Sequence, residues 1–172
     1  MTDLFLERRF DPPLTVDLVL GVATESLPCF VTHQVDWHGS MLSVDGQRLF
    51  CRFSAALRQA GQDASVLWPG TVHDAPVPPD ATPLEPNVMV TRTFADPVAV
   101  EDVQAIEDAG AHCLKAHRVQ FVRTYFSRDR RRMPCLYHAP DAESVRLAQH
   151  QAVMPLDEVI ACRAVRPDML PD

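Results

Sequence analysis

The segments "CFVTHQVDW" (residues 29–37) and "CLKAHRVQF" (residues 113–121) share the pattern Cys-x-x-x-His-x-Val-x-aromatic. The second begins 84 positions after the first (113 − 29), and the same offset pairs many more identical residues. Repetition at a constant offset indicates a duplicated structural unit. The identical residues are Cys29, His33, Val35, Ser43, Asp45, Arg48, Cys51 and Ala55, which match Cys113, His117, Val119, Ser127, Asp129, Arg132, Cys135 and Ala139.

Each copy predicts the element order βαββαβ. Alternating apolar residues indicate the strands, apolar residues three or four positions apart indicate the helices, and the Asp-Gly pair in "VDGQ" indicates a hairpin. Thr15 is expected to cap the first helix, which Pro28 should kink or split. The predicted strands are 3–10, 36–43, 48–53 and 65–73, then 88–94, 118–127, 132–138 and 157–165. The predicted helices are one that follows Thr15 and has apolar residues from Leu18 to Val31, and then 54–61, 98–116 and 141–150.

A proline-rich stretch separates the two copies. Residues 74–87, "DAPVPPDATPLEPN", cannot continue a helix or a central strand and are typical of a stiff, extended linker. The predicted domains are therefore a first repeat at 1–73 and a second repeat at 88–166, followed by a tail at 167–172.

The βαββαβ order is the ferredoxin-like arrangement, in which two helices cover one face of an antiparallel sheet. One copy alone would leave the other face of its sheet bare, and two copies in one chain can bury these faces against each other. The sequence therefore predicts an α+β fold of two tandem ferredoxin-like repeats. They would form an intramolecular pseudo-dimer similar to a dimeric α+β barrel.

Composition limits the partners that we expect. A formal net charge of −7 argues against a nucleic-acid surface or an anionic membrane surface. The sequence has no apolar run long enough to span a bilayer and no apolar core of a signal peptide near its start. Five cysteines without a C-x-x-C pair do not form a disulfide framework, so we expect a cytoplasmic protein.

The duplicated cysteines and histidines are candidate metal ligands. A thiolate and an imidazole four residues apart on a helix project from one face and suit nickel, copper or zinc. A cysteine on the third strand of each copy would complete a Cys-His-Cys set. The alternatives are that these cysteines pack in the core and that the histidines cap helix ends. The candidate ligands are Cys29, His33, Cys51, Cys113, His117 and Cys135.

Two further histidines stand where the copies differ. His38 matches Val122, and His138 matches Ser54. A polar residue at such a position could line an asymmetric pocket and act as a base near neutral pH; the alternative is an exposed histidine at a strand edge. The sequence has no G-x-G-x-x-G or Walker pattern, so we expect no nucleotide cofactor.

Residues 112–146 resemble a bacterial ferredoxin-like family known as domain of unknown function 4242. The resemblance rests on "VQFVRTYFSRD", the basic turn after it and "CLYHAPDAESVR", where His138 stands in place of the usual Glu. The family includes nickel-binding members, and its single-domain members pair as dimers. The resemblance implies a fused tandem version of that dimer, with further homo-oligomerisation as an alternative.

Two functions follow from these observations. The first is a small metal-binding protein that holds nickel or a related transition metal through cysteine and histidine. The second is a cofactor-independent enzyme, similar to monooxygenases or cyclases of related architecture, or a binder of an apolar small molecule in the pseudo-dimer cavity. His38 and His138 would be the catalytic residues of that enzyme.

Overall fold

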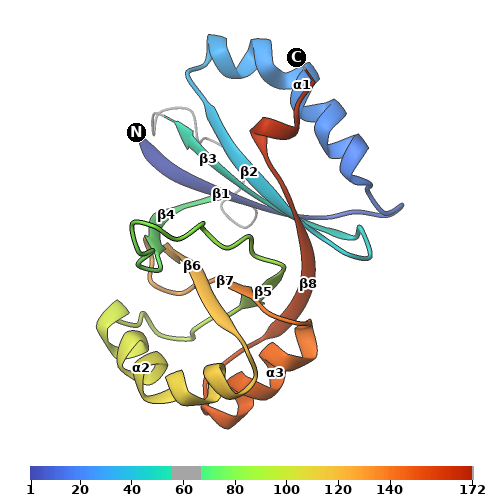
Figure 1. Ribbon diagram of the computed structural model, residues 1–172. Helices are drawn as coiled ribbons and strands as arrows, with labels where there is room; N and C mark the ends of the chain where they lie inside the picture. Colours follow the sequence, from blue (N-terminus) through green and yellow to red (C-terminus); the bar gives the residue numbers. More distant parts are fainter. Residues whose placement is uncertain (56–66, 172) are drawn as a thin grey trace. The chain divides into compact units, whose positions relative to one another are not determined.

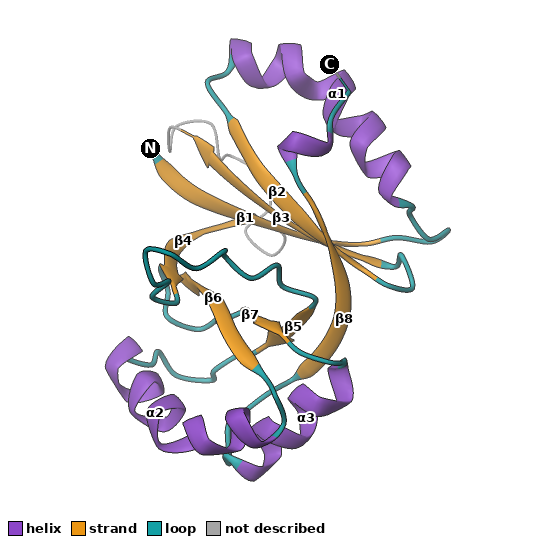
Figure 2. Cartoon of the chain, in the orientation of Figure 1, coloured by secondary structure: helices purple, strands orange, loops and turns teal. Residues whose placement is uncertain are grey.

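The computed structural model describes residues 1–55 and 67–171, and the chain divides into two compact units. Unit 1 comprises Met1–Thr71 with Arg163–Asp172, and unit 2 comprises Val72–Cys162. The described residues form an α+β fold with antiparallel strands (Figures 1 and 2). In chain order the elements are β1 (Thr2–Arg9), α1 (Val16–Thr32), β2 (Asp36–Ser43), β3 (Arg48–Ala55), β4 (Leu67–Asp74), β5 (Val88–Thr91), α2 (Val100–Ala116), β6 (Gln120–Ser127), β7 (Cys135–His138), α3 (Ala142–Gln151), β8 (Glu158–Val165) and the 3₁₀ helix η2 (Pro167–Met169).

The sheets of the two units have matching strand orders. In unit 1, β3 pairs with β1 and β2, and β1 also pairs with β4, which gives the order β4-β1-β3-β2. In unit 2, β7 pairs with β5 and β6, and β5 also pairs with β8, which gives β8-β5-β7-β6. β4 and β8 each begin in one unit and end in the other.

The two long helices end in the same way, at the repeated Cys-x-x-x-His segments. The backbone N–H of His33 donates to the carbonyl of Cys29 at 3.0 Å, and that of His117 donates to the carbonyl of Cys113 at 3.2 Å. The next residue in each unit has a positive φ, 52° at Gln34 and 56° at Arg118. A residue with such a φ ends an α-helix, so the repeated segment is first of all a helix terminus.

Each unit also has an irregular strand at the same place. The register of β2 shifts between Trp37 and Gly39, and that of β6 shifts between Phe121 and Arg123. Gly39 has a φ of +116°, and a Cβ there would lie 2.9 Å from the carbonyl oxygen of Val165. Only glycine fits this backbone without strain. His38 is thus the extra residue of a bulge in β2.

In unit 2 the helices α2 and α3 lie side by side and cover one face of the sheet (Figure 1). Asp141 caps α3 by accepting a hydrogen bond from the N–H of Ser144 at 2.7 Å. A Cβ at Gly110 would lie 2.6 Å from the Cβ of Ala152, so the close approach of α2 to the C-terminal end of α3 requires glycine. Val145 and Ala148 of α3 are fully buried against the sheet.

Most predicted elements agree with the structure. The predicted strand 36–43 has the bounds of β2, whereas the start of the predicted helix 54–61 is wrong because residues 54 and 55 extend β3. The rest of that helix lies outside the described residues. α1 continues past Pro28 and is not split there. None of the described helices is long and apolar enough to cross a membrane.

Candidate functional site

The predicted strand ligands Cys51 and Cys135 are buried beside a hydroxyl group. Ser40 Oγ donates to Cys51 Sγ at 2.8 Å, and Thr124 Oγ1 lies 2.9 Å from Cys135 Sγ. Burial raises the pKa of Cys51 to about 11 and also raises the pKa of Cys135. Both side chains are therefore neutral thiols near neutral pH, whereas a metal ligand must be a thiolate.

In unit 2, Cys135 belongs to a buried polar network that we call the Arg92 cluster. Arg92 is 1% exposed, and its Nη1 donates to Cys135 Sγ at 2.7 Å. Its Nη2 donates to Gln149 Oε1 at 2.7 Å and to the Tyr137 hydroxyl at 3.2 Å. Its Nε donates to the carbonyl of Pro155 at 2.8 Å. The cluster consists of Arg92, Glu107, Thr124, Cys135, Tyr137 and Gln149.

Glu107 is the acidic member of the Arg92 cluster. Its Oε1 is buried and has no hydrogen-bond partner among the described residues. Burial raises the pKa of Glu107, although the nearby Arg92 charge opposes that shift. The guanidinium of Arg92 stays protonated at every physiological pH. A permanent cation 2.7 Å from the sulfur disfavours a metal ion at Cys135.

The other predicted cysteine of unit 2, Cys113, has a histidine beside its sulfur. The ring Nε2 of His112 lies 3.3 Å from Cys113 Sγ, and its Nδ1 lies 3.1 Å from the carbonyl oxygen of Ala109. A carbonyl can only accept, so Nδ1 carries a proton. In the neutral ring, the lone pair of Nε2 therefore faces the sulfur. A hydrogen bond that fixes the tautomer in this way is typical of histidines that bind metals.

The structure places the remaining predicted ligands apart from this pair. His117 Nε2 bonds to Gln151 Oε1 at 3.1 Å, on the neighbouring helix α3. Cys29 and His33 are exposed at the end of α1. Within residues 1–55 and 67–171, no group of three or more His, Cys, Asp or Glu residues is arranged to hold a metal ion.

The two predicted catalytic histidines contact polar groups of their own units. His38 Nε2 lies 2.9 Å from Ser54 Oγ, which in turn lies 3.4 Å from Asp36 Oδ2. In a catalytic triad the carboxylate holds the histidine, whereas here it accepts from the serine. His138 Nδ1 donates to the backbone carbonyl of Glu85 at 2.8 Å, so this side chain anchors a loop.

His112 is the residue that sequence reasoning missed. Adjacent residues on a helix normally point in different directions, so the spacing four residues apart suggested His117 as the partner of Cys113. The signal that was present in the sequence is the difference between the copies. At the offset of 84, His112 matches Pro28 (112 − 84), so the histidine occurs in only one copy.

Comparison with known protein families identifies a match in the second half of the chain. Residues 89–161 match a family described as nickel responsive protein SCO4226-like. The matched segment runs from β5 to β8 of unit 2, and it contains His112, Cys113 and the Arg92 cluster. No curated protein matches the chain. The resemblance of this chain to a nickel-responsive family therefore concerns unit 2.

Proposed function

We propose that this chain binds nickel or a related transition metal through unit 2, with Cys113 and His112 as its first two ligands. The observation that carries the proposal is the 3.3 Å separation of Cys113 Sγ and His112 Nε2. It is supported by the match of residues 89–161 to a family described as nickel responsive.

The separation of the two atoms suits a shared metal ion. Metal–sulfur bonds of about 2.3 Å and metal–nitrogen bonds of about 2.0–2.1 Å put the two donors about 3.1 Å apart at a right angle and about 3.5 Å apart at a tetrahedral angle. The separation of 3.3 Å between Cys113 Sγ and His112 Nε2 falls between these values. An ion would take the place of the thiol proton, and the ring already has its lone pair on Nε2.

Two protein ligands leave other coordination positions open to water or to a further ligand. Such a site exchanges its metal more readily than a closed four-ligand site, as a responsive protein requires. Cys113 is 5% exposed while His112 lies at the surface, so the ion would enter from the His112 side. Because the thiol must lose its proton, binding should weaken as the pH falls.

Titration of the tag-free protein with Ni²⁺ tests this proposal. We expect a saturable thiolate-to-nickel absorption band in the near ultraviolet that Cys113→Ser abolishes. His112→Ala should weaken binding at least about tenfold, the loss of one ligand contributing roughly 1.4 kcal/mol or more. Cys29→Ser is the matched control and should leave the band unchanged. A band that survives Cys113→Ser would contradict the proposed site.

We also propose that the two units are tandem copies of one ferredoxin-like arrangement, with repeats at 1–73 and 88–166 joined by the linker 74–87. Matching strand orders, helix ends and strand bulges support this duplication. The five cysteines are free, which supports a cytoplasmic protein. Catalysis by His38 and His138 stays a prediction of the alternative enzyme function.

A further inference from the structure

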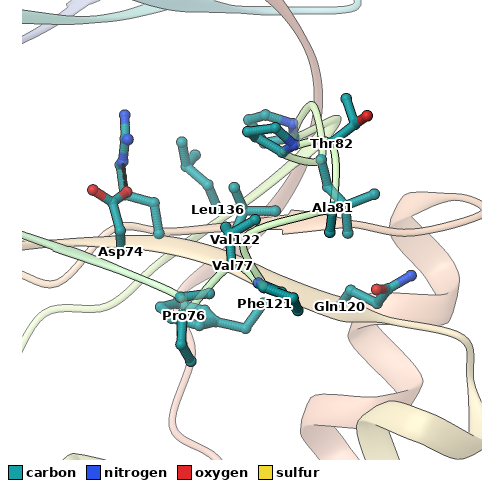
Figure 3. Close-up of a pocket in the computed structure, with 15 residues that line it drawn as sticks. Asp74, Pro76, Val77, Ala81, Thr82, Gln120, Phe121, Val122 and Leu136 are labelled. Carbon is teal, nitrogen blue, oxygen red and sulfur yellow. Dashed lines mark hydrogen bonds and ion pairs between the residues drawn. The ribbon is translucent and has the colours of Figure 1, made fainter.

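The proline-rich stretch of unit 2 encloses a groove on the sheet. Residues 74–86, which we call the proline strap, lie across β6 and β7, and the space between them has a volume of about 760 Å³ (Figure 3). All residues that line this groove belong to unit 2. The volume falls within the range of about 300–1,000 Å³ that is usual for small-molecule sites.

The strap is fixed at both ends. At its start, the N–H of Ala75 donates to the carbonyl of Val122 at 2.9 Å, and Asp74 pairs with Arg123. At its end, His138 holds the carbonyl of Glu85 at 2.8 Å. Asn87, the first residue after the strap, forms two side-chain hydrogen bonds with the backbone of Ala139, at 2.8 and 3.0 Å.

The middle of the strap cannot close against the edge of β6. Proline has no N–H, so a segment with prolines at 76, 78, 79, 83 and 86 cannot form a continuous ladder with a strand. Two fixed ends and a middle that cannot pair keep the groove open. The groove is thus a consequence of the sequence of the strap.

The lining of the groove is mainly apolar. Val77 and Leu84 of the strap are 50% and 39% exposed, and they line the groove together with Phe121 and Leu136 of the sheet. In Figure 3, Asp74 lies at one end of the groove and Ala81, Thr82 and Gln120 lie at the other. A ligand that covered the exposed side chains would remove apolar surface from water.

The two charged residues that line the groove, Asp74 and Arg123, favour an uncharged ligand. Asp74 and Arg123 pair with each other, so they cancel and leave neither charge free to balance a charged ligand. An ionised ligand would lose hydration without gaining a partner. Thr82 and Gln120 can form hydrogen bonds with one polar group of a neutral ligand. Phe121 and the prolines of the strap line the groove with apolar rings, against which an aromatic ring can pack.

We propose that this groove is a binding site for an uncharged aromatic small molecule with one hydrogen-bonding group. The site is separate from the pair formed by Cys113 and His112, neither of which lines the groove. His138, which the sequence suggested as a catalytic residue, then has the role of holding the strap in place.

The test uses 1-naphthol as the probe, with 1-naphthoate and 1-naphthylmethylammonium as charged analogues of the same size. We expect saturable binding of 1-naphthol by calorimetry, and binding at least about tenfold weaker for both charged analogues. Amide shifts in NMR spectra should concentrate at residues 77–84, 120–123 and 136. Absence of saturable binding, or equal binding of all three probes, would overturn the proposal.

Two variants locate the probe. Ala81→Trp places a large ring in the groove from an exposed position and should weaken 1-naphthol binding at least about tenfold. Val153→Trp adds the same ring at a position that is 84% exposed and outside the groove, and it should leave binding unchanged. His112→Ala should also have no effect. Equal binding by Ala81→Trp and the unaltered protein would place the probe elsewhere and refute the site.

Discussion

The two units share a buried hydroxyl–cysteine contact but differ in what surrounds it. Ser40 and Cys51 in unit 1 occupy the same register positions as Thr124 and Cys135 in unit 2. The distances are nearly the same, 2.8 Å and 2.9 Å. This contact therefore belongs to the common framework, and the function of either unit must come from other residues.

The burial of Arg92, and the residues Glu107 and Tyr137 beside it, are specific to unit 2. Glu107 matches Ala23 at the offset of 84 (107 − 84), and Tyr137 matches Phe53 (137 − 84). Arg92 matches Arg8, which is exposed. Unit 1 thus has an alanine and a phenylalanine where unit 2 has the carboxylate and the phenol, and its matching arginine is exposed instead of buried. The same strand order therefore accommodates apolar residues in unit 1 and a buried polar network in unit 2.

The largest expected difference between the units concerns their matched arginines. Arg92→Met removes the buried guanidinium that donates to Cys135, Tyr137 and Gln149. Breaking a buried charged network in this way costs about 3–5 kcal/mol. We expect a loss of that size in the free energy of unfolding, measured by urea denaturation.

Arg8→Met is the control for this change. Arg8 is exposed, and surface substitutions usually change stability by about 0.5 kcal/mol or less. Equal losses from the two variants would mean that the burial of Arg92 has no special importance.

A smaller effect is expected where α2 meets α3. Gly110→Val adds a branched side chain where even a Cβ would lie 2.6 Å from the Cβ of Ala152. Overpacking of this kind costs about 1–3 kcal/mol. Ser26→Val, at the matching position of α1 (110 − 84), should cost less than about 1 kcal/mol. Thermal unfolding of both variants measures the difference. A larger loss from Ser26→Val would show that the helix contact is not the cause.

The sequence predicts the framework of each unit better than its contents. The pattern of apolar residues placed β2, and the Asp141 cap placed the start of α3 within one residue. These features depend on neighbouring residues, so local patterns reveal them. The hydrogen-bond partners of the Arg92 side chain lie 43 to 63 positions away along the chain. Arginine is rarely buried, so nothing local to Arg92 predicts its place in the core.

The metal hypothesis shows the same limit. The repeat drew attention to residues that the copies share, and the structure gives those residues a role in helix ends and in packing. The pair that suits a metal includes His112, which the copies do not share. Between two units with matching strand orders, shared residues mark the framework first, and differences are the better guide to function.

Transfer of the histidine to unit 1 tests that reasoning. Pro28→His places an imidazole next to Cys29 on α1, which has the same length and the same kind of end as α2. We expect the variant to bind one more nickel ion per chain than the unaltered protein, about tenfold more weakly than the proposed site at Cys113 and His112, because Cys29 is exposed. Equilibrium dialysis with metal analysis measures the stoichiometry.

Pro28→Ala distinguishes the effect of the added imidazole from the effect of removing a proline from α1. It also restores a backbone N–H to α1 but supplies no imidazole, so its nickel stoichiometry should equal that of the unaltered protein. If Pro28→His and Pro28→Ala bind the same amount of nickel, an adjacent cysteine and histidine are not sufficient for a site on this helix.

The smallest expected effect is a pH dependence that only unit 2 should have. Burial raises the pKa of Glu107 above its ordinary value of 4.5, so the folded state favours the protonated carboxyl. The protonated Glu107 carboxyl therefore adds to the free energy of unfolding below pH 4.5. This contribution is lost as the pH rises through the folded-state pKa of Glu107. Glu107→Gln, which stays uncharged, should therefore match the unaltered protein in acid and become more stable than it toward neutral pH.

Urea denaturation at several pH values measures this difference, with Glu25→Gln on the exposed face of α1 as the control. A stability difference that does not change with pH would mean that Glu107 is ionised in the folded protein, held by the charge of Arg92.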